Sequence, residues 1–242
     1  DIYKLLKKIG KEDPDIIITD TIGSVGVALA IGKLRYSVPY ILRLRGDIYE
    51  EVYQKIRKYY QESNIKALIK IGVYRFILAK FLIKNSDGIM FVSEYLREKY
   101  NNSKRSEAIP TPCLILDDNE KNISSNELEK ISSQYNILIS VMNMEYYDKI
   151  KGLKDGLNII SDVLDRRNDT KYIILGDGDY HDEIQQQCSQ LSDHIEMHGY
   201  VPNVKPYYNY ADVLIHFSYL DAYPSTILEA YAFQTPVLAN DS

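Results

Sequence analysis

The chain has 242 residues, with 29 lysines and arginines against 34 aspartates and glutamates, so its formal net charge is −5. Hydrophobic residues make up 45% and charged residues 26%, a globular composition that excludes a disordered or collagen-like chain. The acidic balance argues against broad binding to nucleic acid, and Cys113 and Cys188 lack any metal-ligand spacing, which favours a reduced intracellular setting.

The first half of the chain opens in a helical pattern at Asp1 and then alternates strand and helix patterns. Short apolar runs bounded by Asp, Pro or Gly predict strands at 15–19, 39–42, 88–92 and 107–109. Apolar periodicity predicts helices at 23–34, 47–61 and 65–84, and Ser93 is a natural N-cap for one more. The alternation is typical of a parallel sheet with helical crossovers.

The predicted helix at 65–84 carries only basic charges, and four of them, Lys66, Lys70, Lys80 and Lys84, fall within about 80° of arc on one side, with Arg75 elsewhere on the helix. One interpretation is a largely buried helix with a solvated lysine stripe. The other is a basic amphipathic helix that rests on anionic lipid. The protein is therefore expected in the cytoplasm, with peripheral membrane contact through 65–84 as the alternative that this segment leaves open.

A polar stretch from about 113 to 133 is typical of a linker, after which the alternation restarts. Strands are expected at 137–141, 172–175, near 195, 213–217 and 236–239, and helices at 152–164, 180–191, 204–210 and 226–233. The sequence thus predicts an α/β protein with two Rossmann-like domains, 1–112 and 134–242, joined by a linker at 113–133, whose parallel sheets face a cleft. Ligands are expected at the carboxyl ends of the strands.

The segment from Ser218 to Ala230 has the most informative chemistry. A strand ends at Phe217, Asp221 follows in a loop, a helix begins near Ser225, and Glu229 lies inside that helix. The free backbone N–H groups at a helix start suit a phosphate. Two carboxylates beside a phosphate site are explained if they accept hydrogen bonds from the vicinal hydroxyls of a ribose and a sugar ring.

This acid, seven residues and then Glu, followed by Thr-Pro-Val, resembles the E-x7-E signature of retaining glycosyltransferases of family 4, which have the GT-B fold. Further segments match in the same order along nearly the whole chain: Val92-Ser93, Ile109-Pro110, Lys151-Gly152, Ile174 to Gly178 and His198 to Pro202. The resemblance implies transfer of a hexose from a nucleotide diphosphate sugar to a hydroxyl of a glycan or lipid-linked saccharide, with retention. It also implies that the chain is truncated at both ends, with the N-terminal domain incomplete.

The resemblance also assigns roles to residues of the donor domain. It implies that Lys151 neutralises the donor diphosphate, that Glu229 accepts hydrogen bonds from the ribose, and that Asp221 lies next to the hexose as a catalytic residue. The remaining donor-binding residues are Ser225 and Thr226 at the phosphate, Tyr200 and Val201 near the base, and Gly176 of the Gly-Asp-Gly segment. No metal or other cofactor is expected, because the family's reaction is metal-independent.

Two departures from the family pattern affect the catalytic assignment. The usual arginine shortly before Lys151 is missing, and Lys149, in what is expected to be an extended loop, is its substitute. The usual histidine of the N-terminal half is replaced by Arg45, which cannot act as a base but could hold a phosphate or the acceptor. These departures leave two alternatives: a non-catalytic binding or regulatory subunit of the same fold, and a sugar-nucleotide epimerase.

Three smaller points bound the prediction. Gly176-Asp177-Gly178 lacks the third glycine of a dinucleotide fingerprint, which argues against NAD. The histidines form no metal-ligand set, and His216 is expected to be a core residue of its strand. The residues do not distinguish a uridine, guanosine or adenosine donor, nor do they identify the sugar or the acceptor.

Overall fold

The computed structural model describes residues 2–20, 24–69, 74–100, 105–110 and 125–241. The chain divides into two compact units, Asp1–Thr111 and Pro112–Ser242, and each is described by itself. No helix among the described residues has the length and apolar character needed to cross a membrane.

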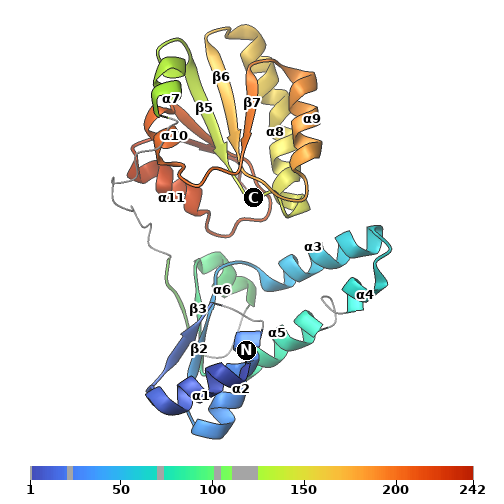
Figure 1. The fold of residues 1–242 in the computed structure, drawn as a ribbon, viewed down its shortest axis with the longest axis vertical. Helices are drawn as coiled ribbons and strands as arrows, with labels where there is room; N and C mark the ends of the chain where they lie inside the picture. The colour runs from blue at the N-terminus through green and yellow to red at the C-terminus, as the bar shows by residue number, and fades with distance from the viewer. Residues whose placement is uncertain (1, 21–23, 70–73, 101–104, 111–124, 242) are drawn as a thin grey trace. The chain divides into compact units, whose positions relative to one another are not determined.

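The first unit contains, within its described residues, a four-stranded parallel sheet with strand order β1-β2-β3-β4 (Figure 1). Its strands are β1 (Ile17–Thr19), β2 (Tyr40–Leu44), β3 (Gly88–Phe91) and β4 (Ser106–Ala108). In the central strands, Leu42, Leu44, Ile89 and Phe91 are at most 2% exposed, and the residues between them on the other face, 41, 43 and 90, are half-buried. Neither face of these strands is open to water, which explains why short apolar runs mark them in the sequence.

The helices of the first unit are α1 (Ile2–Glu12), α2 (Ser24–Tyr36), α3 (Ile48–Gln61), α4 (Ile65–Ala67), α5 (Tyr74–Asn85) and α6 (Glu94–Tyr100). Helix α3 begins where predicted because the Asp47 side chain accepts hydrogen bonds from two backbone N–H groups of its first turn. Ser93 likewise caps α6 by accepting from the backbone N–H of Leu96 at 3.3 Å.

The second unit has a five-stranded parallel sheet with strand order β7-β6-β5-β8-β9 among its described residues. The strands are β5 (Asn136–Val141), β6 (Thr170–Leu175), β7 (Ile195–Gly199), β8 (Val213–His216) and β9 (Val237–Ala239). Strands β6 and β7 follow β5 in one direction, whereas β8 and β9 lie on its other side. The order therefore reverses between β5 and β8, and open α/β sheets bind ligands outside the carboxyl ends of their strands at this position.

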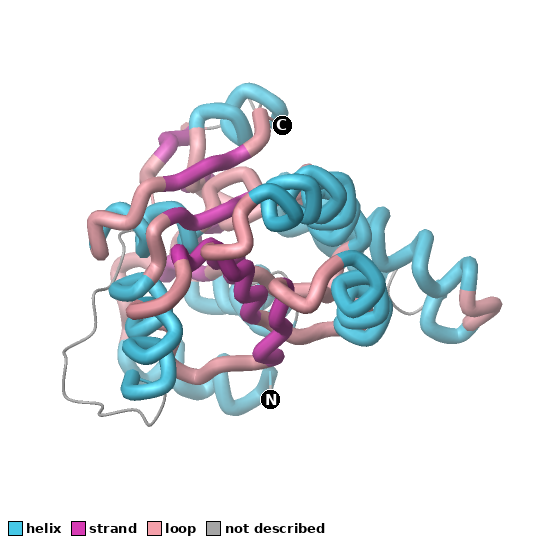
Figure 2. Tube along the Cα trace, turned by 90° about the horizontal axis from the view of Figure 1, so that it is seen from above, coloured by secondary structure: helices cyan, strands magenta, loops and turns pink. Residues whose placement is uncertain are grey.

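Helices cover both faces of the second sheet, as Figures 1 and 2 show. Side chains of α8 (Tyr147–Arg166) and α9 (His181–Leu191) form one buried cluster with Tyr172, Ile174 and Ile215. Side chains of α7 (Ser125–Ser132), α10 (Lys205–Tyr210) and α11 (Ser225–Ala232) form another with Ile173 and Leu214. Neighbouring residues of one strand thus enter opposite cores, as the period of two along a strand requires.

Two sequence expectations need correction, and one falls partly outside the described residues. Helix α8 begins at Tyr147 instead of residue 152, so the loop expected at 146–149 is mostly helical. The segment expected as a linker contributes α7, whose Leu128 is 2% exposed in the core of the second unit, while residues 111–124 lie outside the described residues. The helix expected at 65–84 corresponds to α4 and α5, and residues 70–73 between them lie outside the described residues.

Candidate functional site

The start of α8 lies directly against the end of β8. A Cβ added to Gly152 would be 2.8 Å from backbone atoms of Phe217 and Ser218, a separation that real side chains do not adopt. The Lys-Gly pair of the sequence therefore has a steric basis, because only glycine lets the first turns of α8 approach the loop that follows β8 so closely. This approach brings Lys149 and Lys151 to the carboxyl end of the sheet.

Asp221 is the centre of a charged cluster in the loop after β8. Its Oδ1 atom lies 2.6 Å from the Lys149 ammonium, and its Oδ2 atom lies 3.5 Å from Nε2 of His216. The His216 ring also lies within reach of Thr226, with 3.4 Å between Nδ1 and the hydroxyl oxygen. The structure therefore brings together Asp221, Lys149 and Thr226, which the sequence assigned to the donor site, and adds His216.

The electrostatics of the cluster keep Asp221 ionised at neutral pH. Burial by itself would raise the pKa of Asp221, but the neighbouring His216 ring, the Lys149 ammonium and Ser218 outweigh it. The pKa of the Asp221 carboxyl is consequently held far below its ordinary value. An ionised carboxylate offers only acceptor oxygens, so a ligand at Asp221 would have to present donors such as sugar hydroxyls.

The two lysines of the first turns of α8 differ in environment. Lys149 is half-buried and paired with Asp221, so its predicted role at a phosphate would require it to leave that partner. Lys151 is exposed, and its ammonium lies 5.5 Å from the centroid of the Tyr219 ring. Tyr219 in turn donates a hydrogen bond from its hydroxyl to Asp155 at 3.2 Å. Lys151 is thus positioned at the solvent side of the same loop.

Glu229 and the start of α11 form the other side of the site. Glu229 lies inside α11, and its Oε2 atom accepts a hydrogen bond from the Tyr208 hydroxyl at 2.9 Å. Tyr208 is 1% exposed, so it is a fixed support for the carboxylate. Ser225 and Thr226 occupy the first two positions of α11, where backbone N–H groups have no helical acceptor and favour an anion.

A pocket of about 240 Å³ lies at the carboxyl ends of β5, β6 and β7. It is lined by Gly176, Tyr200 and Val201, which the sequence assigned to the donor site, together with residues that include Asn143 and Val204. Gly176 has a φ of +139°, and a Cβ there would be 1.8 Å from the carbonyl oxygen of Met142. Glycine is therefore needed for the β6 loop to fold over the β5 loop and form the pocket wall.

Arg45 is the predicted site residue that lies in the first unit. It is exposed in the loop that joins β2 to α3, two residues before Asp47. Among the described residues, no group of three or more His, Cys, Asp or Glu side chains has the arrangement of a metal site.

The sequence analysis missed the contacts that two residues, His216 and Tyr208, make in the site. His216 is buried in its strand as expected, at 7% exposure, but its ring also contacts Asp221 and Thr226. The sequence did contain one sign of this contact, because His216 is the last residue of β8 and immediately precedes the site loop. Tyr208 had no signal beyond its apolar helix, because only the folded packing of α10 against α11 brings its hydroxyl to Glu229.

Residues 135–242 match a protein family described as glycosyl transferases group 1. Over 229 residues, 94% of this chain, the chain is 27% identical to the viral protein ORF31 (isolate Australia/Victoria), whose name assigns it as a glycosyltransferase. It is 26% identical, over 93% of its length, to the alpha-monoglucosyldiacylglycerol synthase of Streptococcus pneumoniae. The chain covers 66% and 52% of these relatives, so it spans about half to two thirds of their length.

Among solved structures, the chain is similar to Alr3699/HepE of Anabaena, which was determined in complex with UDP-glucose. The TM-score is 0.68 at 15% sequence identity, and the match covers 98% of this chain and 62% of that one. At this identity the similarity shows the fold, with both parallel-sheet units included in the match.

Proposed function

We propose that this chain, whose residues 135–242 belong to the group 1 glycosyltransferases with the GT-B fold, transfers a hexose from a nucleotide diphosphate sugar to a saccharide hydroxyl with retention. One observation carries the proposal. Asp221 with its partners Lys149 and His216, and Glu229 on its Tyr208 support, gather at the carboxyl edge of a single parallel sheet. Two supported carboxylates beside a helix start match the needs of a ligand that has hydroxyls and a diphosphate.

Uridine diphosphate is the donor carrier that we propose first. The Anabaena structure holds UDP-glucose, and its fold covers nearly this whole chain. In this assignment the base enters the pocket at Gly176 and Val201, and Glu229 accepts hydrogen bonds from the ribose. Tyr208 donates a hydrogen bond to Oε2 of Glu229, and in this proposal Oε1 accepts from the ribose hydroxyls.

The leaving diphosphate is stabilised by cations and backbone N–H groups in this proposal. Lys151 and the first N–H groups of α11, at Ser225 and Thr226, contact the phosphates, where preorganised positive charge lowers the barrier to bond cleavage. Lys149 exchanges Asp221 for a phosphate oxygen, and Asp221 then accepts hydrogen bonds from the hexose. The transfer needs no divalent metal, and retained rates in EDTA are the expected result.

Arg45 is proposed to hold the acceptor in the first unit. Its guanidinium stays protonated at any working pH, so it supplies hydrogen-bond donors and charge rather than a base.

The test is UDP binding and donor turnover by the whole chain. We expect UDP to bind, and Glu229→Gln to weaken binding by about tenfold or more, because a hydrogen bond to a charged group contributes about 1.5–3 kcal/mol. Glu129→Gln is the matched control, since Glu129 is an exposed glutamate on α7 of the same unit. Equal UDP affinities in the two variants would contradict the assignment of Glu229.

Product analysis with UDP-glucose and UDP-N-acetylglucosamine separates the alternatives. UDP release that rises with a saccharide acceptor, with the product anomer the same as the donor anomer, supports retaining transfer. A changed sugar nucleotide without any acceptor would identify an epimerase. Binding of UDP-sugar without turnover would identify a non-catalytic subunit.

A peripheral membrane contact is proposed at α5, within the segment expected at 65–84. Ile77 and Phe81 are 61% and 48% exposed, and they share one helix face with the exposed Lys80 and Lys84. Apolar and basic side chains on one face suit an anionic bilayer surface, and one relative is named for a glucosylated diacylglycerol. Co-sedimentation should be stronger with anionic than with neutral vesicles, and equal binding to both would contradict this contact.

A further inference from the structure

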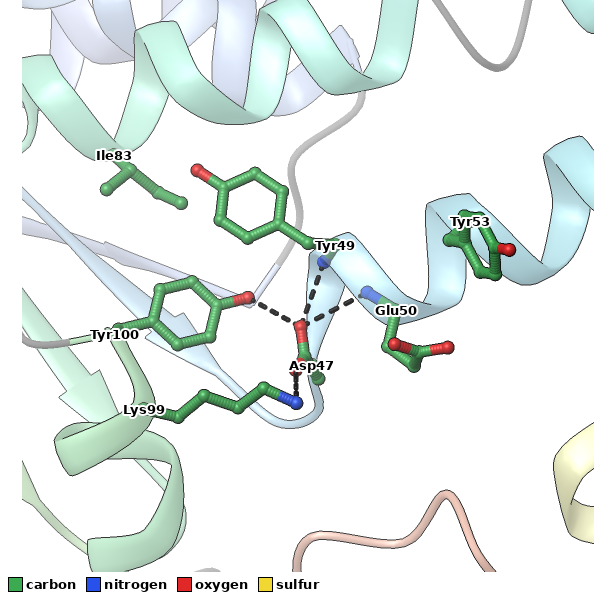
Figure 3. A pocket seen from close by; sticks show the side chains of 7 residues that line it. All are labelled: Asp47, Tyr49, Glu50, Tyr53, Ile83, Lys99 and Tyr100. Carbon is green, nitrogen blue, oxygen red and sulfur yellow. Dashed lines mark hydrogen bonds and ion pairs between the residues drawn. The ribbon is translucent and has the colours of Figure 1, made fainter.

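The first unit contains a pocket of about 500 Å³ that the donor site does not use. It lies where the start of α3, the end of α6 and Ile83 of α5 meet (Figure 3). This volume falls within the range of about 300–1,000 Å³ that is typical of small-molecule sites. We propose that this pocket binds a neutral pyranose unit of a saccharide acceptor, a proposal that rests on the glycosyl transfer proposed above.

Asp47 fixes the two walls of the pocket to each other. Its Oδ1 atom accepts hydrogen bonds from the backbone N–H groups of Tyr49 and Glu50, at 3.1 and 3.2 Å, and from the Tyr100 hydroxyl at 3.1 Å. Its Oδ2 atom pairs with the Lys99 ammonium at 2.7 Å. Burial opposes ionisation of Asp47. Hydrogen bonds from the Lys99 ammonium, the backbone N–H of Glu50 and the Tyr100 hydroxyl, together with the Lys99 charge, nevertheless lower the pKa of Asp47. With these four partners, Asp47 holds α3 to α6 and offers little to a ligand.

Aromatic rings form the apolar part of the lining. Tyr49 and Tyr100 stack with ring centroids 5.4 Å apart, and Tyr53 lies one helical turn after Tyr49 on α3. Tyr53 is 58% exposed, so its ring is open to a ligand that enters from solvent. A pyranose ring presents a face of C–H groups, which packs on the electron-rich face of an aromatic side chain.

The charges of the lining favour a neutral ligand over an anionic one. Lys99 is neutralised by Asp47, so the Glu50 carboxylate gives the pocket its net negative charge. Oε1 of Glu50 accepts a hydrogen bond from Gln54 at 3.1 Å, which orients the carboxylate. Figure 3 shows the Lys99 and Glu50 side chains on either side of Asp47. A carboxylate accepts hydrogen bonds from two neighbouring hydroxyls of a sugar but repels a uronic acid or a phosphate.

The position along the chain connects the pocket with the acceptor. The loop from β2 to α3 carries both Arg45, proposed to hold the acceptor, and Asp47, which anchors the pocket, only two residues apart. A saccharide that occupies the pocket would therefore extend along the loop that contains Arg45.

The test is disaccharide binding to the whole chain without donor, measured by calorimetric titration. Maltose, gentiobiose and chitobiose are the neutral probes, octyl maltoside presents the same sugar on a lipid-like tail, and a glucuronate-containing disaccharide is the anionic probe. We expect at least one neutral probe to bind, and the anionic probe to bind about fivefold more weakly or worse. Preference for octyl maltoside over maltose would identify a lipid-linked acceptor, and equal binding a free glycan. Absence of binding by every neutral probe, or stronger binding of the anionic one, would overturn the proposal.

Matched variants separate the pocket from a purely structural cluster. Tyr53→Ala should weaken binding of the neutral probe by about tenfold, whereas Tyr60→Ala, which removes a 75% exposed tyrosine of the same helix outside the pocket, should change it less than about twofold. Glu50→Gln should reduce the ratio between the Kd values of the anionic and the neutral probe. A residue with only a structural role would leave this ratio unchanged. Equal effects of the two tyrosine variants, or unchanged discrimination in Glu50→Gln, would overturn the proposal.

UDP titrations of the same samples keep the two proposals distinguishable. Disaccharide binding without UDP binding would contradict the UDP-dependent transfer and leave the pocket standing. UDP binding without disaccharide binding would contradict the pocket and leave the UDP-dependent transfer standing.

Discussion

The ion pair between Lys149 and Asp221 should contribute measurably to the stability of the second unit. A double-mutant cycle with Lys149→Met, Asp221→Asn and the double variant isolates the interaction from the other effects of each substitution. Methionine keeps the length and apolar stem of lysine, and asparagine keeps the shape of aspartate. The coupling energy is then the stability change of the double variant minus the sum of the single changes.

The structure sets the expected magnitude. At the observed separation of 2.6 Å, two unit charges attract by about 1.6 kcal/mol in bulk water and by about 6 kcal/mol at an effective dielectric constant near 20. The two side chains are 20% and 19% exposed, and partial loss of water opposes the attraction. We therefore expect a coupling of about 2 kcal/mol at pH 7, above the roughly 0.2–1 kcal/mol of fully exposed pairs.

The pH dependence has a definite sign. The pKa of Asp221 is lower in the folded protein than in the unfolded chain, so the unfolded chain takes up the proton first as the pH falls. The stabilisation is complete above the unfolded pKa of about 3.9 and decreases as the pH falls from there through the folded pKa. The coupling at about pH 3 should consequently be smaller than at pH 7.

Urea unfolding followed by circular dichroism measures the cycle, because the chain has no tryptophan to report by fluorescence. The two units can unfold in separate transitions, and the transition that shifts in Asp221→Asn is the one to analyse. A coupling below about 0.5 kcal/mol at pH 7 would refute the reasoning, because it would place the pair in the range of exposed ion pairs. A coupling that grows on acidification would refute it as well.

Substitutions at three further positions test the packing of the two units by thermal and urea unfolding. Gly176→Ala should cost more than about 2 kcal/mol, because its Cβ would clash with the carbonyl of Met142 at a positive φ, and an unchanged Tm would contradict this. Asp47→Ala should cost about 2–3 kcal/mol by losing the helix cap and the partner of Tyr100, while Asp47→Asn, which still caps, should cost clearly less. Leu214→Ala, at a fully buried position, should cost about 2–5 kcal/mol without changing the denaturant m value.

The architecture was accessible from the sequence because the strands are buried on both faces. Runs such as 172–175 and 213–217 are continuous in apolar character, and both became strands of a parallel sheet. The predicted resemblance to glycosyltransferases is confirmed by the match of residues 135–242 to the glycosyl transferases group 1, and the predicted GT-B fold by the similarity in structure, whereas family 4 and retention stay predictions.

The start of α8 escaped prediction for a physical reason. Tyr146, its N-cap residue, makes no side-chain capping hydrogen bond, so the usual start signal is absent. The turn forms because Ile150 is fully buried and Gly152 packs on the β8 loop. These are tertiary contacts, and a local pattern does not contain them.

The sequence was sufficient to identify the two carboxylates of the candidate site, but not to identify the side chains that contact them. Asp221 and Glu229 were identified by their spacing, whereas the partners His216 and Tyr208 come from a strand and a helix that only the fold brings close. Lys149 was expected at a phosphate, and the structure instead pairs it with Asp221. The assigned roles in donor binding and catalysis stay predictions.

The steric seal at Gly152 has a consequence for how this sequence can diverge. Because the first turns of α8 and the β8 loop lie in backbone contact, the backbone at 149 and at 221 cannot draw apart to accommodate a substitution at either position. A homologue that replaces the lysine with a neutral residue would leave a half-buried carboxylate without its cation. In natural relatives that keep the glycine, the identities at these two positions should therefore covary, with lineages changing both or neither.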